Sequence, residues 1–443
     1  ETARLNYFGR VDYDYAGKYL FQFNWRYDGS ENFPKGNRFG FFPGVSMGWR
    51  ISEEKFWKEH VKWMDYFKLR ASWGQMGNDK VSAFQYVTAY TFSNPGVFGA
   101  NGGKANTGLR LNRTANPNIT WEVADTWNVG IESKFLDYFN FEGDFFVTKR
   151  SNILTARNAA IPEYAGLSLP DENIGKCKSI GTELTLGYNR QLNKDWGLHL
   201  SGNFSYSHGT IDYIDEPAET LEWQRRTGKT IGTQGSNYLM YESIGIFRTQ
   251  DDLDSYPHLS DARVGDVKFR DVNGDKKIDG DDKVRMDKPA VPEIMYGINI
   301  GTTYRNWSLN MLWQGAAHVW QYTFMEAGII GNFTKDFYDN RWTEDNPNAK
   351  YPRTYNRDAT VTGGGNYRNS FWLNNASYLR LKSIELAYNC PKSWFKGTPI
   401  SGVRLCLTGY NLLTFTGIKN IDPETQENSQ GWAAWNTPQS KVY

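Results

Sequence analysis

The segment from Lys18 to Asp28 alternates aromatic and polar residues. A strand turns successive side chains to opposite faces of its sheet, so this segment predicts one aromatic face and one charged, hydrated face. The aromatic positions are Tyr19, Phe21, Phe23, Trp25 and Tyr27, and the polar positions include Gln22, Asn24 and Arg26. The same alternation recurs over 67–74 and 196–207. Long strands with one apolar and one wet face are typical of a large transmembrane β-barrel.

The alternation, followed along the chain, predicts strands at 7–15, 19–28, 39–51, 66–75, 121–134, 139–149, 179–189, 196–208, 294–304, 307–316, 378–389 and 402–413. Tight hairpins at 16–17, 137–138 and 305–306 and modest turns at 52–65, 190–195 and 390–401 alternate with longer connections. The longest of these are 76–120, 150–178, 209–293 and 317–377. Bacterial outer-membrane barrels have short periplasmic turns and long extracellular loops. The first strand is therefore predicted to descend from the cell surface, and the last to ascend.

Composition narrows the class of protein further. Aromatic residues make up 16% of the chain, the mean hydropathy is −0.64, and no run of roughly 18 apolar residues exists to form a membrane helix. Lysine and arginine number 50 against 49 acidic residues, which gives no reason to expect a nucleic-acid partner. Cys177, Cys390 and Cys406 include no Cys-x-x-Cys pair, so neither a disulfide framework nor a zinc site is indicated.

The two ends of the chain predict a piece of a larger barrel. No signal peptide stands at Glu1, and strand-like sequence begins at Tyr7. Residues 438–443 read as the start of one more descending strand. An open barrel edge would leave unpaired backbone groups in lipid, at a cost of several kcal/mol each. Residues 1–443 are therefore expected to be the C-terminal portion of an even-stranded barrel whose N-terminal strands and most of whose last strand lie elsewhere.

Five ordered motifs carry a family resemblance. They are Phe8-Gly-Arg-Val-Asp-Tyr with Arg26-Tyr-Asp-Gly-Ser and Gly48-Trp-Arg-Ile-Ser; Asn116-Pro-Asn-Ile-Thr-Trp-Glu; Gly265-Asp-Val-Lys-Phe-Arg-Asp-Val-Asn-Gly-Asp; Arg341-Trp-Thr-Glu-Asp-Asn-Pro-Asn-Ala-Lys-Tyr-Pro-Arg; and Ala376-Ser-Tyr-Leu-Arg-Leu-Lys-Ser with Gly409-Tyr-Asn-Leu-Leu-Thr-Phe-Thr. Their order and spacing resemble the C-terminal barrel region of SusC-like TonB-dependent outer-membrane transporters, over essentially the whole chain.

This resemblance implies an all-β fold, the C-terminal part of a 22-stranded antiparallel transmembrane barrel in the outer membrane of a Gram-negative bacterium. It also implies a plug domain and a TonB-contacting segment upstream of Glu1. The expected activity is import of oligosaccharides, or in some members of peptides, energised through TonB. The expected partners are TonB, outer-membrane lipid and a SusD-like surface lipoprotein that closes over the extracellular loops as a lid.

One loop has metal-binding spacing of its own. The run from Asp271 to Asp282 resembles the twelve-residue calcium loop of EF-hands, with the sharp-turn glycine replaced by Lys276 and the final glutamate by aspartate. An alternative is a metal-free turn in which Asp and Asn side chains cap the backbone. The predicted Ca²⁺ ligands are Asp271, Asn273, Asp275, the carbonyl of Lys277, Asp279 and Asp282.

The remaining candidates concern substrate and catalysis. Trp432 and Trp435 lie in the predicted extracellular loop 414–437, where they could stack on a glycan or form an aromatic plug against the lid. The strand tryptophans are interpreted as membrane-interface girdles. Carboxylates on the predicted lumen face are the ordinary lining of a barrel, and the histidines are scattered without a nucleophile motif. No catalytic residue, and no enzyme, is expected.

Two other classes of protein remain open. A passive porin, or a barrel whose long loops serve adhesion or secretion, would share the strands but lack an upstream plug domain. A secreted carbohydrate-binding sandwich or propeller would show turns every 8–12 residues instead of the observed alternation of tight hairpins and very long loops. The five ordered motifs favour the energised importer.

Overall fold

The computed structural model describes residues 3–97, 105–157, 169–233, 235, 238–324, 334–354, 367–419, 421–425 and 440–442. The chain divides into two compact units. The first comprises Glu1–Lys134, Gly143–Thr182 and Gly209–Thr220, and the second comprises Phe135–Glu142, Glu183–His208 and Leu221–Tyr443.

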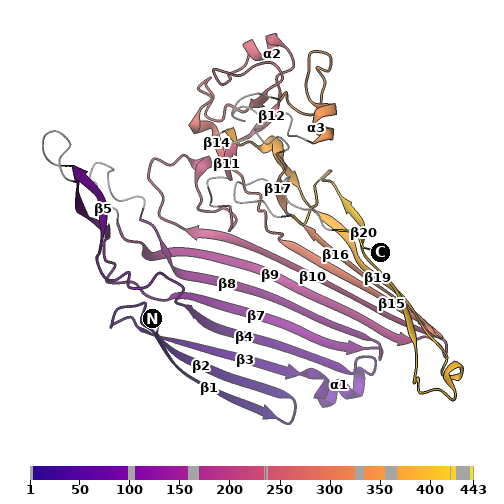
Figure 1. Cartoon of the computed structure of the whole chain (residues 1–443). Helices are drawn as coiled ribbons and strands as arrows, with labels where there is room; N and C mark the ends of the chain where they lie inside the picture. The colour runs from indigo at the N-terminus through magenta and orange to yellow at the C-terminus, as the bar shows by residue number, and fades with distance from the viewer. Residues whose placement is uncertain are drawn as a thin grey trace. The chain divides into compact units, whose positions relative to one another are not determined.

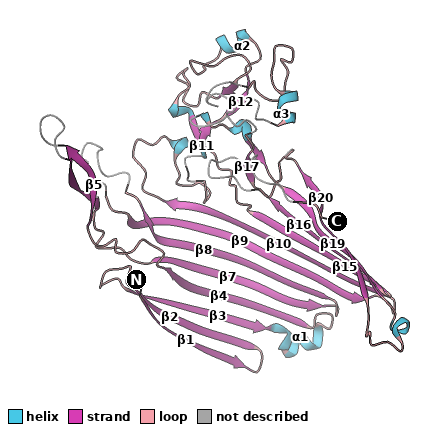
Figure 2. Cartoon of the chain, in the orientation of Figure 1, coloured by secondary structure: helices cyan, strands magenta, loops and turns pink. Residues whose placement is uncertain are grey.

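Twelve long strands form one sheet, in which the hydrogen-bonded order follows the order along the chain (Figures 1 and 2). They are β1 Arg4–Tyr15, β2 Tyr19–Ser30, β3 Phe39–Arg50, β4 Tyr66–Asn78, β7 Glu122–Phe135, β8 Phe139–Thr155, β9 Glu172–Gln191, β10 Trp196–Tyr213, β15 Ile294–Tyr304, β16 Trp307–Ala317, β19 Tyr378–Asn389 and β20 Arg404–Thr416. All twelve predicted strands are confirmed. The largest errors are at β8, β9 and β10, which extend by five to seven residues beyond the predicted ends, where the loop-side sequence loses its apolar alternation.

The predicted tight hairpins are also confirmed. Between β1 and β2, Ala16 and Gly17 both have positive φ, at 55° and 67°. Two-residue turns of this hand match the right-handed twist of the flanking strands. The hairpin between β7 and β8 places its positive-φ residues at Leu136 and Asp137, one residue earlier than predicted. Short turns of this kind hold the two strands of each hairpin in register.

The pairing register of the first unit gives the sheet two unlike faces. Rows of paired residues cross β1, β2, β3, β4 and β7 in turn. One row comprises Asp12, Gln22, Ser46, Ser72 and Asn128, and the row beside it comprises Val11, Phe23, Val45, Trp73 and Trp127. Because a one-residue shift in register would exchange the two faces, this agreement across five strands fixes the pairing.

The second unit repeats the arrangement across β10, β15, β16, β19 and β20. An apolar row comprises Leu200, Ile300, Met311 and Ile384. The adjacent row comprises His199, Gly301, Asn310, Glu385 and Thr408. Beyond β20, Val442 pairs with Tyr410 through two backbone hydrogen bonds of 2.8 and 3.1 Å. That pairing is consistent with the predicted start of a further strand.

The connections contain elements that the alternation did not predict. Four short antiparallel pairs are β5 Ala89–Val97 with β6 Ala105–Arg113, β11 Leu239–Tyr241 with β14 Lys283–Arg285, β12 Ser243–Ile246 with β13 Val267–Phe269, and β17 Trp320–Tyr322 with β18 Leu373–Asn375. The helices are α1 Lys55–His60, α2 Gln250–Asp254 and α3 Lys335–Asn340, with short 3₁₀ turns at η1 Ile51–Glu53, η3 Glu222–Gln224, η5 Gly280–Asp282, η7 Ser370–Trp372 and η8 Lys392–Phe395. Among the described residues, none of these helices has the length and apolar character needed to span a membrane.

Candidate functional site

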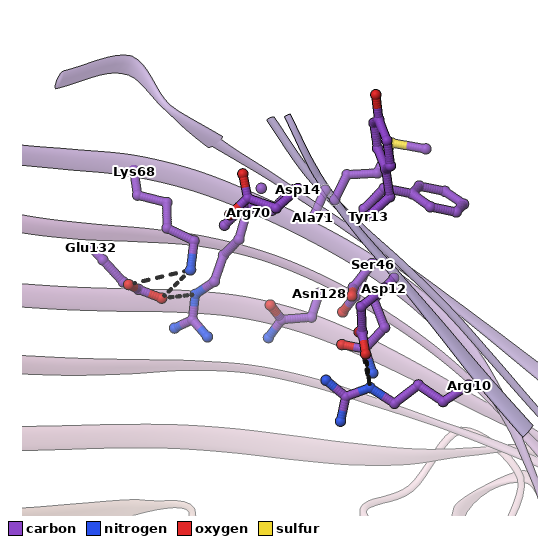
Figure 3. A pocket seen from close by; sticks show the side chains of 16 residues that line it. Arg10, Asp12, Tyr13, Asp14, Ser46, Lys68, Arg70, Ala71, Asn128 and Glu132 are labelled. Atoms are coloured by element: carbon purple, nitrogen blue, oxygen red, sulfur yellow. Dashed lines mark hydrogen bonds and ion pairs between the residues drawn. The ribbon is translucent and has the colours of Figure 1, made fainter. Parts of the chain in front are cut away.

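The polar face of the first unit carries a network of ion pairs. Glu132 on β7 accepts from Lys68 at 3.2 Å and lies 3.4 Å from the Arg70 guanidinium, both on β4 (Figure 3). Arg70 also pairs with Asp144 on β8 at 2.5 Å. Gly130 makes room for this pair, because a Cβ there would lie 2.6 Å from the Arg70 side chain and 2.7 Å from Asp144. Charges of both signs are thus held in place along this wall.

A hollow of about 660 Å³ lies against the same strands. Arg10 and Asp12, paired at 2.8 Å, mark one side of it, and Lys68, Arg70 and Glu132 mark the other (Figure 3). Neutral polar groups lie between them, namely Gln22, Ser46, Ser72 and Asn128. Hydrogen-bond donors and acceptors therefore alternate with paired charges. The lining also includes Tyr13, Leu20, Phe21, Met47 and Ala71, so polar and apolar groups both border the hollow.

The described parts of 221–293 and 317–377, which make up most of the two longest connections, fold together within the second unit. Their shared core contains Met240 and Met286 from the first connection and Tyr322, Phe324, Phe337, Tyr351, Trp372 and Leu373 from the second. A second cluster joins Tyr241, Val267, Phe269 and Ile278. Burial of large aromatic side chains supplies most of the free energy that orders such a unit. These connections therefore present a preformed surface.

Backbone and side-chain hydrogen bonds tie the two connections to each other. The Arg248 guanidinium donates to the carbonyls of Pro347 and Ala349, each at 2.8 Å. The Tyr241 amide donates to the Arg368 carbonyl at 3.0 Å, and the Arg353 amide to the Gly265 carbonyl at 2.8 Å. Desolvation in this core raises the pKa of Tyr241 to about 12. The phenol therefore stays neutral at physiological pH.

The loop 271–282 uses its acidic side chains to bind its own backbone. Asp271 accepts from the amides of Gly274 and Lys276 at 2.7 and 3.0 Å. Asp282, which is fully buried, accepts from Val272 at 2.8 Å and from Asp279 at 2.9 Å. Asn273, Asp275 and Asp279 accept from the amides of Asp275, Lys277 and Asp281. All six predicted positions thus lie in one tight turn.

The backbone is strained at Lys276, which occupies the position of the EF-hand glycine, as the sequence predicted. Lys276 has φ of 66°, a left-handed conformation that glycine adopts freely and lysine does not. In the described part of the chain, no three acidic, histidine or cysteine side chains converge as metal ligands. The capping hydrogen bonds match the metal-free alternative, and Ca²⁺ binding by this loop stays a prediction.

A buried cluster that the sequence analysis missed holds residues 421–425 against β19. Arg380 is 2% exposed and pairs with Asp422 at 2.7 Å and with Glu424 at 2.6 Å. Lys382 lies 3.0 Å from Glu424, and the Tyr378 hydroxyl donates to the Glu424 carboxylate at 2.7 Å. About forty residues separate the basic strand from its acidic partners, so no local pattern could have revealed the cluster.

The other sequence candidates have mixed outcomes. Trp432 and Trp435 lie outside the described residues. Asp144 and Glu385 are each paired with an arginine, Arg70 and Arg404, as expected of structural lining residues. Strand aromatics form rows at the strand ends joined by tight turns, including Tyr15, Tyr19 and Trp49 in one row and Trp307 with Tyr388 in another. These rows support the interpretation as girdles.

One family model matches nearly the whole sheet. Residues 1–412 match the model of the TonB dependent receptor-like β-barrel. The chain belongs to this family. Its members are receptors and transporters of the Gram-negative outer membrane, and their barrel explains the two-faced strands and the alternation of short turns with long loops.

Curated relatives of this TonB-dependent barrel match along nearly its entire length. It is 30% identical to TonB-dependent receptor P3 of Formosa agariphila over 99% of this chain and 43% of the relative. It is 26% identical to TonB-dependent receptor SusC of Bacteroides thetaiotaomicron over 95% of this chain and 41% of the relative. The chain thus spans less than half the length of the curated relatives it matches.

Solved structures agree with this placement. The RagAB peptide importer in its "closed-closed" state is 25% identical, with a TM-score of 0.74 over 99% of this chain and 47% of the other. The "open-open" state gives a TM-score of 0.72 at 25% identity over 96% of this chain and 44% of the other. The predicted resemblance to SusC-like transporters is therefore confirmed.

Proposed function

We propose that the protein containing this barrel imports oligosaccharides across the outer membrane, energised through TonB and closed by a SusD-like surface lipoprotein. The observation that carries the proposal is the joint folding of the described parts of 221–293 and 317–377 around two hydrophobic clusters rich in aromatic residues. Long loops usually serve binding, and an ordered loop surface loses little entropy when a partner docks. In the hollow, the amides of Gln22 and Asn128 and the hydroxyls of Ser46 and Ser72 offer hydrogen bonds to a hydroxyl-rich solute.

Peptide import is the second candidate. It is favoured by the similarity to the RagAB peptide importer and by the paired charges of Lys68, Arg70 and Glu132, which could bind backbone and charged termini. A passive porin, or an adhesive barrel, is the third. These candidates differ in their dependence on energy and in the chemistry of any retained ligand.

Copurification tests the lidded-importer proposal. We expect the full-length protein, extracted from outer membranes in mild detergent, to carry a second polypeptide bound at the extracellular loops. We also expect oligosaccharide uptake to stop when TonB is removed. Mass spectrometry of the purified complex would identify a retained glycan or peptide. Uptake that persists without TonB, in a complex that lacks a second polypeptide, would establish the passive channel instead.

A calcium-bound loop 271–282 is proposed as a support for this loop surface. The motif spacing supports it, since six oxygen-bearing positions fall within one turn. We expect Asp271→Asn with Asp275→Asn to remove calcium-dependent protection of 265–285 from proteolysis, while Asp251→Asn, an exposed acid outside the loop, leaves it unchanged. Equal protection of the unmodified protein in calcium and in chelator would leave the turn as a purely backbone-capped structure.

A further inference from the structure

The connection 51–65 between β3 and β4 is longer than a hairpin requires and exposes aromatic side chains. It contains η1 and the six-residue α1, which lies where β3 leads into β4 (Figure 1). Phe56 is 53% exposed and Trp63 is 55% exposed. Two large apolar side chains are therefore exposed in one short connection outside the strands of the sheet.

The connection is continuous with the apolar face of the sheet. The ring of Trp57 stacks on Phe67 of β4 with centroids 5.1 Å apart and an interplanar angle of 1°. Phe67 lies two residues from Leu69, which pairs with Trp49 in an apolar row. Glu54 accepts hydrogen bonds from Tyr19 at 2.7 Å and from Trp49 at 3.3 Å. The connection is thus anchored on the aromatic row that marks the edge of the lipid-facing surface.

Lysines stand directly beside the exposed rings, in a connection that also carries Glu53, Glu54, Glu59 and Asp65. Lys55 precedes Phe56, and Lys62 precedes Trp63. Both lysines are exposed, and neither has an ion pair or a side-chain hydrogen bond among the described residues. Lys58, by contrast, pairs with Glu53. An aromatic ring beside a lysine is the arrangement found at a membrane interface, where the ring enters the headgroup region and the ammonium reaches the phosphate.

The connection after β19 repeats this chemistry in the second unit. Trp394 in η8 is 64% exposed, and its ring lies 6.3 Å from Tyr388 in the aromatic row of β16 and β19. Exposed Lys392 and Lys396 flank it. Both connections follow strands that descend toward the periplasm in the assigned topology. The connection 51–65 and the connection after β19 therefore share an exposed aromatic ring beside exposed lysines, at the same end of the strands.

We propose that the connection 51–65 is an interfacial anchor that binds phospholipids of the periplasmic leaflet. Phe56 and Trp63 enter the boundary of the acyl region. Lys55 and Lys62 bind headgroup phosphates, and Lys58 remains occupied by Glu53. This proposal depends on the insertion of the barrel in the outer membrane. It does not depend on which solute the barrel imports. It holds the sheet at a defined depth where β3 turns into β4.

Photocrosslinking in the full-length protein tests the anchor. A benzophenone amino acid replaces Phe56 or Trp63, and adducts formed in native membranes are identified by mass spectrometry. We expect phospholipid adducts at both positions. Position 129, an exposed apolar position on β7, serves as the lipid-facing control, and position 128, on the polar row, serves as the control that should give none.

The lysines are tested in nanodiscs of phosphatidylethanolamine and phosphatidylglycerol. Lys55→Gln with Lys62→Gln should lower the yield of phosphatidylglycerol adducts by about fivefold per lysine removed, the effect of one basic residue at an anionic surface. Lys58→Gln is the matched control and should change little. Adducts with protein alone, or no adducts while position 129 reacts, would overturn the anchor. Adducts with lipopolysaccharide would place this end at the cell surface and overturn it as well. Solute uptake, measured separately, is not the criterion.

Discussion

Phe23→Arg is expected to prevent insertion of the barrel. Phe23 lies near the middle of β2 and pairs with Val11 and Val45 in an apolar row. An arginine on the lipid face costs about 2–4 kcal/mol at the bilayer midplane, a large fraction of the stability of a single domain. The folded, membrane-inserted fraction is measured by heat-modifiable migration on gels after fractionation of the outer membrane.

Asn24→Arg is the matched variant for this experiment. Asn24 is the next residue along the same strand, pairs with Arg10 and Gly44, and belongs to the polar face. The new side chain can extend into water, so the inserted fraction should stay close to that of the unmodified protein. Equal loss in both variants would mean that the two faces do not differ in environment, and would remove the assignment of the apolar row to lipid.

Arg380→Met is expected to release residues 421–425 from β19. The substitution leaves Asp422 and Glu424, with side chains 8% and 13% exposed, facing the site of a lost positive charge. Removing one partner of a buried ion pair typically costs about 3–5 kcal/mol, because the remaining charge stays desolvated. Amide hydrogen exchange of 417–425 should therefore accelerate by several orders of magnitude while exchange in β16 is unchanged.

Arg404→Met supplies the comparison. Arg404 pairs with Glu385 at 2.6 Å, as close as the buried pair, but the two side chains are 49% and 34% exposed. Solvent screens such a pair, and its loss should cost less than about 1 kcal/mol. A second comparison adds Asp422→Asn and Glu424→Gln to Arg380→Met, which should recover part of the protection. The Gln321 side chain also donates to the Pro423 carbonyl at 2.7 Å. Normal exchange in Arg380→Met alone would show that this hydrogen bond and the backbone contacts suffice to hold the segment.

Alternation along the chain was enough to determine the sheet. The period of two in segments such as 19–28 is a local property of a strand, and a barrel in lipid requires it because one face contacts hydrocarbon and the other contacts water. Loop lengths then predicted whether each strand descends or ascends through the membrane. The five ordered motifs indicated the family, because their order reflects the whole chain and not one local preference.

The interior of the long connections could not be predicted from alternation along the chain. The core of Met240, Phe337 and Trp372 joins residues more than a hundred positions apart, and the elements around it are only three to six residues long. Elements this short have too few positions to show a period, and their stability comes from tertiary packing instead of local propensity. The sequence therefore predicts loops with a binding role, but it contains no local signal that these loops form a folded core.

The charged groups show the same division. Strand parity is local, so the alternation was enough to place Arg70 and Asp144 on a polar face. Their ion pair, and the contact of Arg70 with Glu132, depend on the register of β4, β7 and β8 and on the space left by Gly130. Register and close approach are properties of neighbouring strands, and the physical chemistry of one strand does not contain them.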